Sequence, residues 1–413
     1  MLLYINIRSM SKVILHIDLN AFFVRCEELK NPNLIGKAVI IGHEGRSGIV
    51  STCSYEARKY GIHSGMPTFM ATQKCKDLII IPGDYSFYEE MSDKFFNYIY
   101  RYSSLVEKAS IDECYVDMTH YLKKGDDVMS KLKELQDGLY KETGLMCSIG
   151  VASTKFLAKM GSDYKKPMGI TIIRRKDIPT ILYPLPISSF FGIGKKSAPE
   201  LERMGIHTIG DLAFHLNNED ADLKAQLGKF YYVTKDWING YGDDTIDIEP
   251  FDPKSIGHSR TLIHNTNDFE EIKVTLLKLC DYSIERAKAK DKLARGVQIT
   301  LKDATMHNGQ FKLITRSKKL DKATLDVNII KRTATSLLKE NLGDHYIRLI
   351  GVSLQNLIDK GDNVEQLSLF DDYDEIKEKY ATKLLINELN RKFKKDVFKT
   401  LGDKYQEQKH GIK

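Results

Sequence analysis

Three acidic residues in this chain have the type and placement to do chemistry. Asp18 lies in the run VILHIDLNAFF, and the pair Asp112 and Glu113 lies in ASIDECYVDM, with 94 residues separating Asp18 from Asp112. Each group lies in or beside an apolar stretch that is typical of a buried strand. Burying a carboxylate costs several kcal/mol unless a positive charge compensates it. We therefore expect cations among these acids.

Divalent metal ions are the compensation that oxygen ligands favour. Converging carboxylates raise one another's pKa values, and bound Mg²⁺ removes that penalty. Two metal ions held about 3.5–4 Å apart are the apparatus of in-line phosphoryl transfer, which points to nucleotide chemistry. Taken alone, the acids leave a plainer interpretation open. In it, Asp18 caps a helix that begins at Asn20, and the acidic pair lies in a surface turn.

The elements expected to position these acids are a mixture of strands and helices. Apolar patterning predicts amphipathic helices at 85–103 and 126–142. No Gly-rich nucleotide loop accompanies them, so we predict an α+β sheet domain and not a doubly wound one. Buried strands are predicted at 12–18, 38–41, 114–118, 147–152 and 170–173.

Length and composition exclude some classes of protein. A chain of 413 residues is too long for one hydrophobic core and suggests two to four domains. No apolar run approaches the length of a membrane span, so we expect no membrane partner. The six cysteines show no CxxC or Cys/His ligand spacing, which favours reduced thiols and a cytoplasmic protein.

From about residue 176 the chain changes character. The stretch FFGIGKKSAPELERMGIHTIGDLAFH places a Gly-x-Gly turn between short helices. Such a turn exposes backbone N–H groups beside a helix N-terminus and can hold a phosphate. Residues 241–255 (YGDDTIDIEPFDPKS) are acidic and poor in helix formers, which predicts an interdomain linker.

The segment 256–357 has the layout of a separate domain. Its pattern is strand, helix (269–290), two strands, helix (325–340) and strand, the split β-α-β-β-α-β order. In RGVQITLKD apolar and polar residues alternate, as in a sheet with one solvated face. Residues 254–357 contain 19 Lys and Arg against 11 Asp and Glu. A small basic sheet domain on a linker is typical of a module that binds the nucleic-acid backbone.

Five motifs together resemble those of Y-family translesion DNA polymerases, and most closely the bacterial DNA polymerase IV branch. They are HIDLNAFF, VSTCSYEARKYGIHSGMP, SIDECYVDM, CSIGVASTKFLAKMGSDYKKPMG and FFGIGKK, in the order and at about the spacing of that family. The resemblance covers roughly residues 12–370. It implies a right-hand polymerase with these parts: an N-terminal extension (1–11), a palm (12–23 and 85–175), small fingers (24–84), a helix-hairpin-helix thumb (176–240), the linker (241–255), a little finger (256–357) and a tail (358–413).

The resemblance also implies roles for individual residues. Asp18, Asp112 and Glu113 would bind two Mg²⁺ ions together with the main-chain carbonyl of Leu19, with Mn²⁺ as a substitute. Phe23 matches the steric gate, the aromatic that excludes a ribose 2′-hydroxyl. The residues expected to contact the dNTP triphosphate are Thr52, Tyr55, Arg58 and Lys166.

Further expected contacts concern DNA and the sliding clamp. Primer-template DNA would lie on the thumb hairpin and on arginines of the little finger. The segment 366–370 resembles the peptide that binds the bacterial sliding clamp, a short extended segment with apolar anchors. The residues in question are Gly192, Gly194, Lys195, Arg260, Arg295 and Arg348 for DNA, and Gln366, Leu367, Leu369 and Phe370 for the clamp.

The sequence departs from the family pattern at Asn20, where DNA polymerase IV relatives usually carry a second Asp and the DxNAF form resembles the UmuC-like branch. We expect residues 1–9 to be dispensable, because MSKVILHID from Met10 is typical of the family's start. The tail after 372 is predicted to hold an amphipathic helix. The expected function is low-fidelity DNA synthesis across damaged bases by a monomer. The alternatives are a catalytically silent DNA-binding or clamp-tethering protein of the same fold, and a two-metal nuclease.

Overall fold

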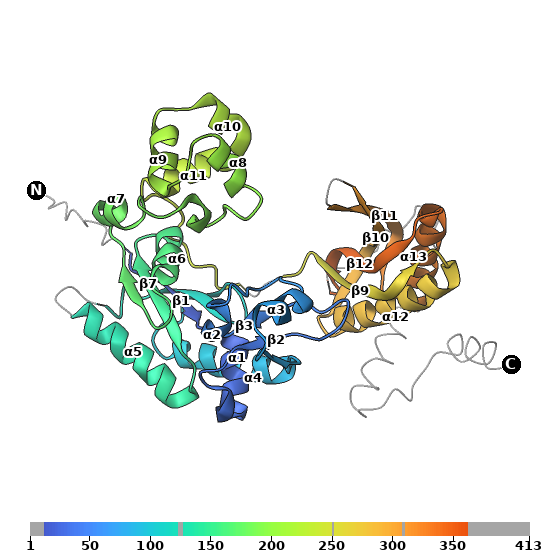
Figure 1. Cartoon of the computed structure of the whole chain (residues 1–413), viewed down its shortest axis with the longest axis horizontal. Helices are drawn as coiled ribbons and strands as arrows, with labels where there is room; N and C mark the ends of the chain where they lie inside the picture. The colour runs from blue at the N-terminus through green and yellow to red at the C-terminus, as the bar shows by residue number, and fades with distance from the viewer. Residues whose placement is uncertain (1–11, 123–126, 250–251, 308–309, 362–413) are drawn as a thin grey trace, which may run out of the picture. The chain divides into compact units, whose positions relative to one another are not determined.

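The computed structural model describes residues 12–122, 127–249, 252–307 and 310–361 (Figure 1). The predictions for residues 1–9, for the clamp-binding segment at 366–370 and for the helix after 372 lie outside the described residues. The chain divides into two compact units, Met1–Asp252 and Pro253–Lys413, and each is described by itself. Within the described ranges, no helix combines the length and apolarity needed to cross a bilayer.

A five-stranded sheet in the order β5-β6-β1-β7-β8 forms the centre of the first unit. Strand β1 lies in its middle and pairs antiparallel with β6 and β7, whereas β7 and β8 are parallel. The four strands predicted for this region are confirmed to within two residues, as β1 (Ile14–Leu19), β6 (Glu113–Asp117), β7 (Cys147–Ala152) and β8 (Ile170–Ile172). The fifth strand, β5 (Val106–Lys108), was not predicted.

One face of this sheet packs on the largest core of the unit. Strand side chains alternate between faces, so Leu15, Ile17 and Leu19 of β1 all enter this core. The helices that supply the other side of the core include both predicted amphipathic helices, which are confirmed with ends shifted by up to three residues. They are α1 (Phe22–Lys30), α4 (Tyr85–Tyr100) and α5 (Val128–Thr143).

The opposite face of the sheet carries helix α6 (Lys155–Tyr164). His16 and Asp18 point to this side, because they occupy the even positions of β1. Gly150 of β7 lies directly against the helix, where an added Cβ would come within 1.9 Å of the Ala158 carbonyl oxygen. The absence of a side chain at Gly150 therefore lets α6 approach the sheet closely and brings its side chains over Asp18.

A smaller sheet in the order β3-β2-β4 corresponds to the expected fingers. Its core is separate from that of the large sheet and includes Ile40, Cys53 and Ala57. Strand β2 confirms the strand predicted at 38–41. The elements are η1 (Pro32–Leu34), β2 (Val39–Ile41), β3 (Thr52–Cys53), α2 (Tyr55–Arg58), α3 (Thr68–Lys74) and β4 (Ile79–Ile81).

The region expected to form the thumb is helical. Its core is continuous with residues of α6, including Phe156, which stacks on Trp237 with ring centroids 4.7 Å apart. The elements are η2 (Arg175–Asp177), α7 (Ile178–Ile181), η3 (Ile187–Ser189), α8 (Ala198–Arg203), α9 (Ile209–Asn217), α10 (Ala221–Leu227) and α11 (Phe230–Ile238).

The first part of the expected linker is bound to the first unit. The Lys12 ammonium donates to the carbonyl and carboxylate of Asp244, and the Asp247 N–H donates to Glu107. Lys155 completes the attachment, with its ammonium 2.8 Å from a carboxylate oxygen of Asp243. The acidic residues that predicted a linker therefore bind lysines of the expected palm.

The second unit is a four-stranded antiparallel sheet in the order β11-β10-β12-β9, with α12 and α13 packed on one face. The chain order is β-α-β-β-α-β, as predicted. Val297, Ile299 and Leu301 are buried against the helices, which confirms the alternation predicted for β10. The elements are β9 (Ser255–Thr266), α12 (Phe269–Lys288), β10 (Lys292–His307), β11 (Gln310–Thr324), α13 (Val327–Leu342) and β12 (Ile347–Asp359).

Candidate active site

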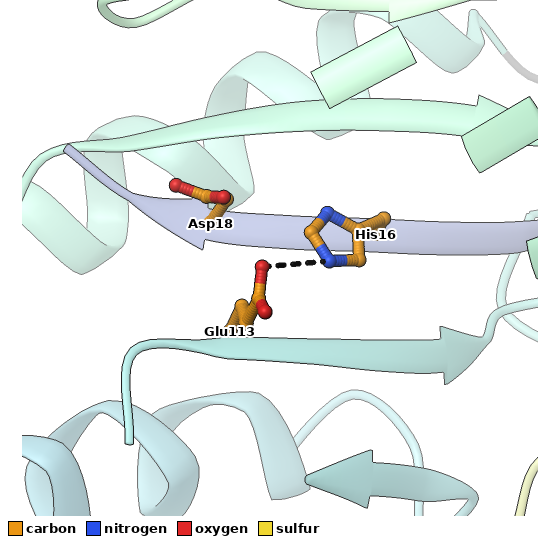
Figure 2. Close-up of side chains that lie close together, drawn as sticks. All are labelled: His16, Asp18 and Glu113. Atoms are coloured by element: carbon orange, nitrogen blue, oxygen red, sulfur yellow. Dashed lines mark ion pairs between the residues drawn. The ribbon is translucent and has the colours of Figure 1, made fainter. Parts of the chain in front are cut away.

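The pairing of β1 with β6 brings two of the predicted acids together. Asp18 and Glu113 are direct partners in the antiparallel register, so both side chains lie on the α6 side of the sheet. Figure 2 shows them with His16, and one ligand atom from each of the three residues lies within 4.8 Å of the others. Asp18 belongs to a strand, and helix α1 begins only at Phe22. The interpretation of Asp18 as the cap of a helix beginning at Asn20 is therefore wrong.

Asp112 directly precedes β6 and is tied to the end of β1. Its carbonyl accepts a hydrogen bond from the Leu19 N–H at 2.9 Å, and its carboxylate accepts one from the Ser110 hydroxyl at 2.6 Å. Burial raises the pKa of Asp112, and the charges of Asp18 and Glu113 raise it further, against the effect of the Ser110 hydrogen bond. Asp112 therefore shares the electrostatic environment of the other two acids, while its side chain is bound to Ser110.

Two lysine ammonium groups lie among the acids. Lys159 of α6 bridges Asp18 and Glu113, at 3.0 and 2.7 Å from their oxygens. Lys166 lies 2.8 Å from the other oxygen of Asp18 and 2.8 Å from Asp163. Burial alone would lower the pKa of each lysine, but the charges of Asp18 and Asp163 outweigh it and raise both pKa values. Both lysines are therefore firmly cationic.

His16 lies two residues before Asp18 on β1 and is fully buried. Its Nδ1 is 2.8 Å from the Ser162 hydroxyl of α6, and its Nε2 is 3.3 Å from a carboxylate oxygen of Glu113. Burial lowers the pKa of His16, whereas its contact with Glu113 acts in the opposite direction. The same contact lowers the pKa of Glu113, with Lys159 acting in the same sense against the cost of burial. His16 thus contacts Glu113, one of the expected metal ligands.

The donor set suits hard divalent cations. Asp18 and Glu113 present carboxylate oxygens to a common point, which is the type of ligand that Mg²⁺ and Mn²⁺ take. One ammonium group already joins the two carboxylates, so the position between them attracts positive charge. The residues present therefore fit the expected metal ions.

Phe23, the expected steric gate, is held by a stack of aromatic rings. Its ring lies parallel to that of Tyr88 with centroids 4.3 Å apart, and Tyr85 meets it edge-on at 5.8 Å. Tyr88 is fully buried and donates its hydroxyl to Glu27 at 2.7 Å. Tyr85 and Tyr88 of α4 therefore fix the position of the Phe23 ring.

The three fingers residues expected to contact the triphosphate lie close in sequence on β3 and α2. Thr52 is half-buried at the start of β3, and the Arg58 guanidinium lies 4.6 Å over the ring of Tyr55. Among the described residues, the buried Tyr55 hydroxyl finds no hydrogen-bond partner. Burial raises the Tyr55 pKa, and the charges of Arg58 and Lys166 lower it. The structure thus places Tyr55 within the electrostatic range of Lys166, with a buried hydroxyl that is unpaired among the described residues.

One glycine of the expected thumb hairpin has a left-handed backbone conformation. Gly192 has φ 95°, and a Cβ there would come within 2.6 Å of the Phe230 ring. Gly194 and Lys195 are exposed and precede α8, and the Lys195 ammonium lies 3.3 Å from Nδ1 of His63 in the fingers. The hairpin therefore presents exposed backbone and a lysine to solvent.

The three arginines of the second unit that are expected to bind DNA differ in their surroundings. Arg260 and Arg295 are exposed, on β9 and β10. Arg348 is half-buried on β12, with its guanidinium 5.3 Å over the Phe311 ring. Arg348 is thus more constrained than the other two.

The chain is similar to a family of known proteins over most of its length. A profile of the impB/mucB/samB family matches residues 17–163, the profile of its C-terminal domain matches 253–369, and the helix-hairpin-helix motif of the same family matches 175–206. DNA polymerase IV 1 of Bacillus subtilis is 37% identical over 386 residues, covering 93% of this chain and 91% of that protein. The chain belongs to the Y family of DNA polymerases.

Other relatives agree with this assignment. DNA polymerase IV 1 of Halalkalibacterium halodurans is 38% identical over 370 residues, covering 89% of this chain and 87% of that protein. Among solved structures, a Y-family DNA polymerase chimera of Dbh and Dpo4 matches with a TM-score of 0.71 and 27% identity, covering 84% of this chain and 99% of the chimera. The expected family and its palm, fingers, thumb and little finger are confirmed, and the chain is a DNA-directed DNA polymerase.

Sequence reasoning did not find several residues that surround the acids. Lys159 and Asp163 lie one helical turn apart in KFLAKMGSD, and this spacing was the available signal. His16 could be found from the alternation of β1, because it lies on the same face as Asp18. Asn20 and Gln136 both bind the main chain of Met168, and no local sequence pattern predicts these contacts.

Proposed function

We propose that this polymerase adds deoxynucleotides to a primer 3′-hydroxyl by two-metal nucleotidyl transfer, with Mg²⁺ held by Asp18, Asp112, Glu113 and the main-chain carbonyl of Leu19. The observation that carries this proposal is the pair of Asp18 and Glu113, whose carboxylates both contact the ammonium group of Lys159. When bound, the two ions would lower the pKa of the attacking hydroxyl and neutralise the triphosphate and the leaving pyrophosphate.

Four residues of this chain would bind the triphosphate. Lys166 already binds an anionic group, Asp18, and would exchange part of that contact for phosphate oxygens. Arg58 can bind phosphate oxygens bidentately, and its position over Tyr55 limits the orientations open to it. The buried Tyr55 hydroxyl, unpaired among the described residues, would donate to a phosphate oxygen, and Thr52 would add a neutral donor. Their joint effect is to hold the α-phosphate against the primer terminus.

Phe23 would select the sugar of the incoming nucleotide. Its ring is fixed by the stack on Tyr88, so it cannot turn aside without losing that contact. A ribose 2′-hydroxyl placed against a fixed ring meets a steric clash, whereas a deoxyribose fits. Discrimination then needs no hydrogen bond.

Residues of each unit would bind the phosphate backbone of the DNA. The exposed backbone at Gly192 and Gly194, with Lys195, suits a phosphate of the duplex. In the second unit, the described helices α12 and α13 pack on the same face of the sheet, and residues 254–357 carry an excess of positive charge. Arg260, Arg295 and Arg348 are the proposed phosphate partners there.

Synthesis across damaged bases follows from the small fingers. Their sheet has three strands of two or three residues each, and Ser51, beside the expected triphosphate contacts, is exposed. A fingers domain of this size would close loosely over the nascent base pair. The choice of the incoming nucleotide would then depend mostly on base pairing with the template. We infer low fidelity and tolerance of altered template bases.

A primer-extension assay tests this function. Labelled primer-template, four dNTPs and Mg²⁺ are incubated with the full chain and with an Asp112→Ala/Glu113→Ala variant. The proposal predicts template-directed extension by the natural chain and none by the variant. No extension at any enzyme concentration would support a silent scaffold, and a shortened primer would support a nuclease.

We also propose that the segment 366–370 binds the sliding clamp. Gln366, Leu369 and Phe370 supply an amide and apolar anchors for a groove on a partner. Replacing these three residues by Ala should leave synthesis by the polymerase alone unchanged and remove at least about 90% of its stimulation by the clamp, because tethering acts through effective concentration. The comparison is made on primed circular DNA with a loaded clamp. Equal stimulation of both proteins would rule out this assignment.

A further inference from the structure

Asn20 directly follows β1 and is almost completely buried, and its side-chain amide is held by hydrogen bonds to two other segments. Its Oδ1 accepts a hydrogen bond from the Met168 N–H at 2.8 Å, and its Nδ2 donates to the Ser148 hydroxyl at 3.0 Å. Only an acceptor can face an N–H group, which fixes the orientation of the amide. Asn20 therefore joins the catalytic strand to a loop that lies 148 residues further along the chain.

That loop, residues 165–169 and here called the lysine loop, presents Lys166 to Asp18. It turns back on itself so tightly that a Cβ on Gly169 would come within 1.8 Å of the Lys165 carbonyl oxygen. Met168 has φ 60°, a left-handed conformation that a non-glycine residue rarely adopts. A strained residue of this kind persists only where its surroundings hold it in place.

A second buried amide holds the other side of Met168. Gln136 of α5 donates its Nε2 to the Met168 carbonyl at 3.1 Å and to the Cys147 carbonyl at 2.9 Å. Gln136 is almost fully buried, like Asn20, and its Oε1 accepts from Lys133. The N–H and the C=O of Met168 are thus each bound by a buried side-chain amide from a different element.

We propose that Asn20 and Gln136 are positioning residues that hold the lysine loop so that Lys166 reaches the nucleotide triphosphate. This inference rests on the proposed role of Lys166 in binding the triphosphate. Neither amide touches the reacting atoms. Both act by fixing the peptide two residues beyond Lys166, whose ammonium is already at the edge of the acid site.

The two amides have opposite chemical requirements. Position 20 must accept a hydrogen bond, so Asn20→Asp can keep the bond to Met168 while the Ser148 hydroxyl turns to donate to the second oxygen. Position 136 must donate to two carbonyls, so Gln136→Glu places an acceptor against two acceptors. The proposal therefore predicts that an acid is tolerated at 20 and harmful at 136.

The test is single-nucleotide insertion by the full chain, with KM for dNTP, kcat, primer-template affinity and melting temperature measured for each variant. Asn20→Leu and Gln136→Glu should each raise KM for dNTP about tenfold, the effect of losing one charge-assisted contact, with kcat and DNA affinity within about threefold. Asn20→Asp should stay within about threefold of the natural chain in every parameter. An Asn20→Asp variant as poor as Asn20→Leu would overturn the proposal.

A double-mutant cycle with Lys166→Met separates positioning from a general structural role. If Asn20 acts through Lys166, adding Asn20→Leu to Lys166→Met should change KM by less than about twofold. Effects that multiply in full would contradict the inference even if the variants are less stable. A Lys166→Met variant with the KM of the natural chain would instead refute the triphosphate role of Lys166 itself, so the two failures are distinguishable.

Discussion

Replacing Asp18 by Asn should reduce the rate of nucleotide insertion at least about a thousandfold, because metal binding supplies several kcal/mol of transition-state stabilisation. The change keeps the size of the side chain and removes the charge that faces Glu113 across Lys159. Primer-template affinity should stay within about threefold. Single-turnover insertion of one matched dNTP in saturating Mg²⁺, with DNA binding measured by fluorescence anisotropy, checks both results.

Asp163→Asn is the matched control for this prediction. Asp163 lies 2.8 Å from Lys166 and 3.5 Å from Lys159, so it shares both ammonium partners with Asp18. Its side chain is 45% exposed and lies on α6, outside the group of ligand atoms formed by His16, Asp18 and Glu113. We expect its loss to slow insertion by less than about tenfold. Equal losses in the two variants would show that charge balance, and not metal ligation, explains the role of Asp18.

Replacing Phe23 by Ala should lower the preference for dNTP over rNTP by about 10- to 100-fold, the size of a steric clash of about 1–3 kcal/mol. In the natural chain the Phe23 ring stacks on Tyr88, and its removal leaves room for the 2′-hydroxyl of a ribonucleotide. The measurement is the ratio of kcat/KM for a dNTP and the matching rNTP, taken opposite the same template base.

Phe23→Tyr is the control, since it keeps the ring and its stack on Tyr88. Its sugar preference should remain within about threefold of the natural chain. The Tyr88→Phe variant removes only the hydroxyl that donates to Glu27 and should behave similarly, because the stacked ring remains. Unchanged sugar selection in Phe23→Ala would place the gate at another residue.

The strands that carry the acids could be predicted because their signals are local. The alternation of β1 between Leu15, Ile17 and Leu19 on one side and His16 and Asp18 on the other can be found in the sequence alone. The same holds for the second unit, where the alternation of β10 and the order of elements along the chain were predicted correctly. Periodicity determines which face is buried, and that is enough to place a strand residue.

The partners of the acids could not be predicted, because they depend on how elements pack. Lys159 reaches Asp18 only because α6 approaches the sheet at Gly150, a distance that no pattern in the helix reveals. The bond from Asn20 to Met168 joins residues 148 positions apart through a loop with an unusual backbone conformation. The side chain of Asp112 accepts a hydrogen bond from Ser110. This contact depends on the rotamer of Asp112, which the sequence pattern does not determine.

The linker shows the same limit. The division between the two units falls within the acidic stretch 241–255, yet composition does not reveal that Asp243 and Asp244 bind Lys155 and Lys12. Sequence alone indicates a tether. The structure shows that residues Asp243, Asp244 and Asp247 of this stretch are bound to the first unit.

Counting the metal ions bound at the active site tests the two-metal proposal. The complex contains the full chain, a primer ending in a dideoxynucleotide and the matched dNTP, and bound Mn²⁺ is measured from the loss of the free-ion EPR signal against protein-free dNTP and DNA. We predict two Mn²⁺ ions per complex for the natural chain and fewer than one for the Asp112→Asn/Glu113→Gln variant. Equal numbers of bound ions in the two proteins would contradict the assignment of these acids as the metal ligands.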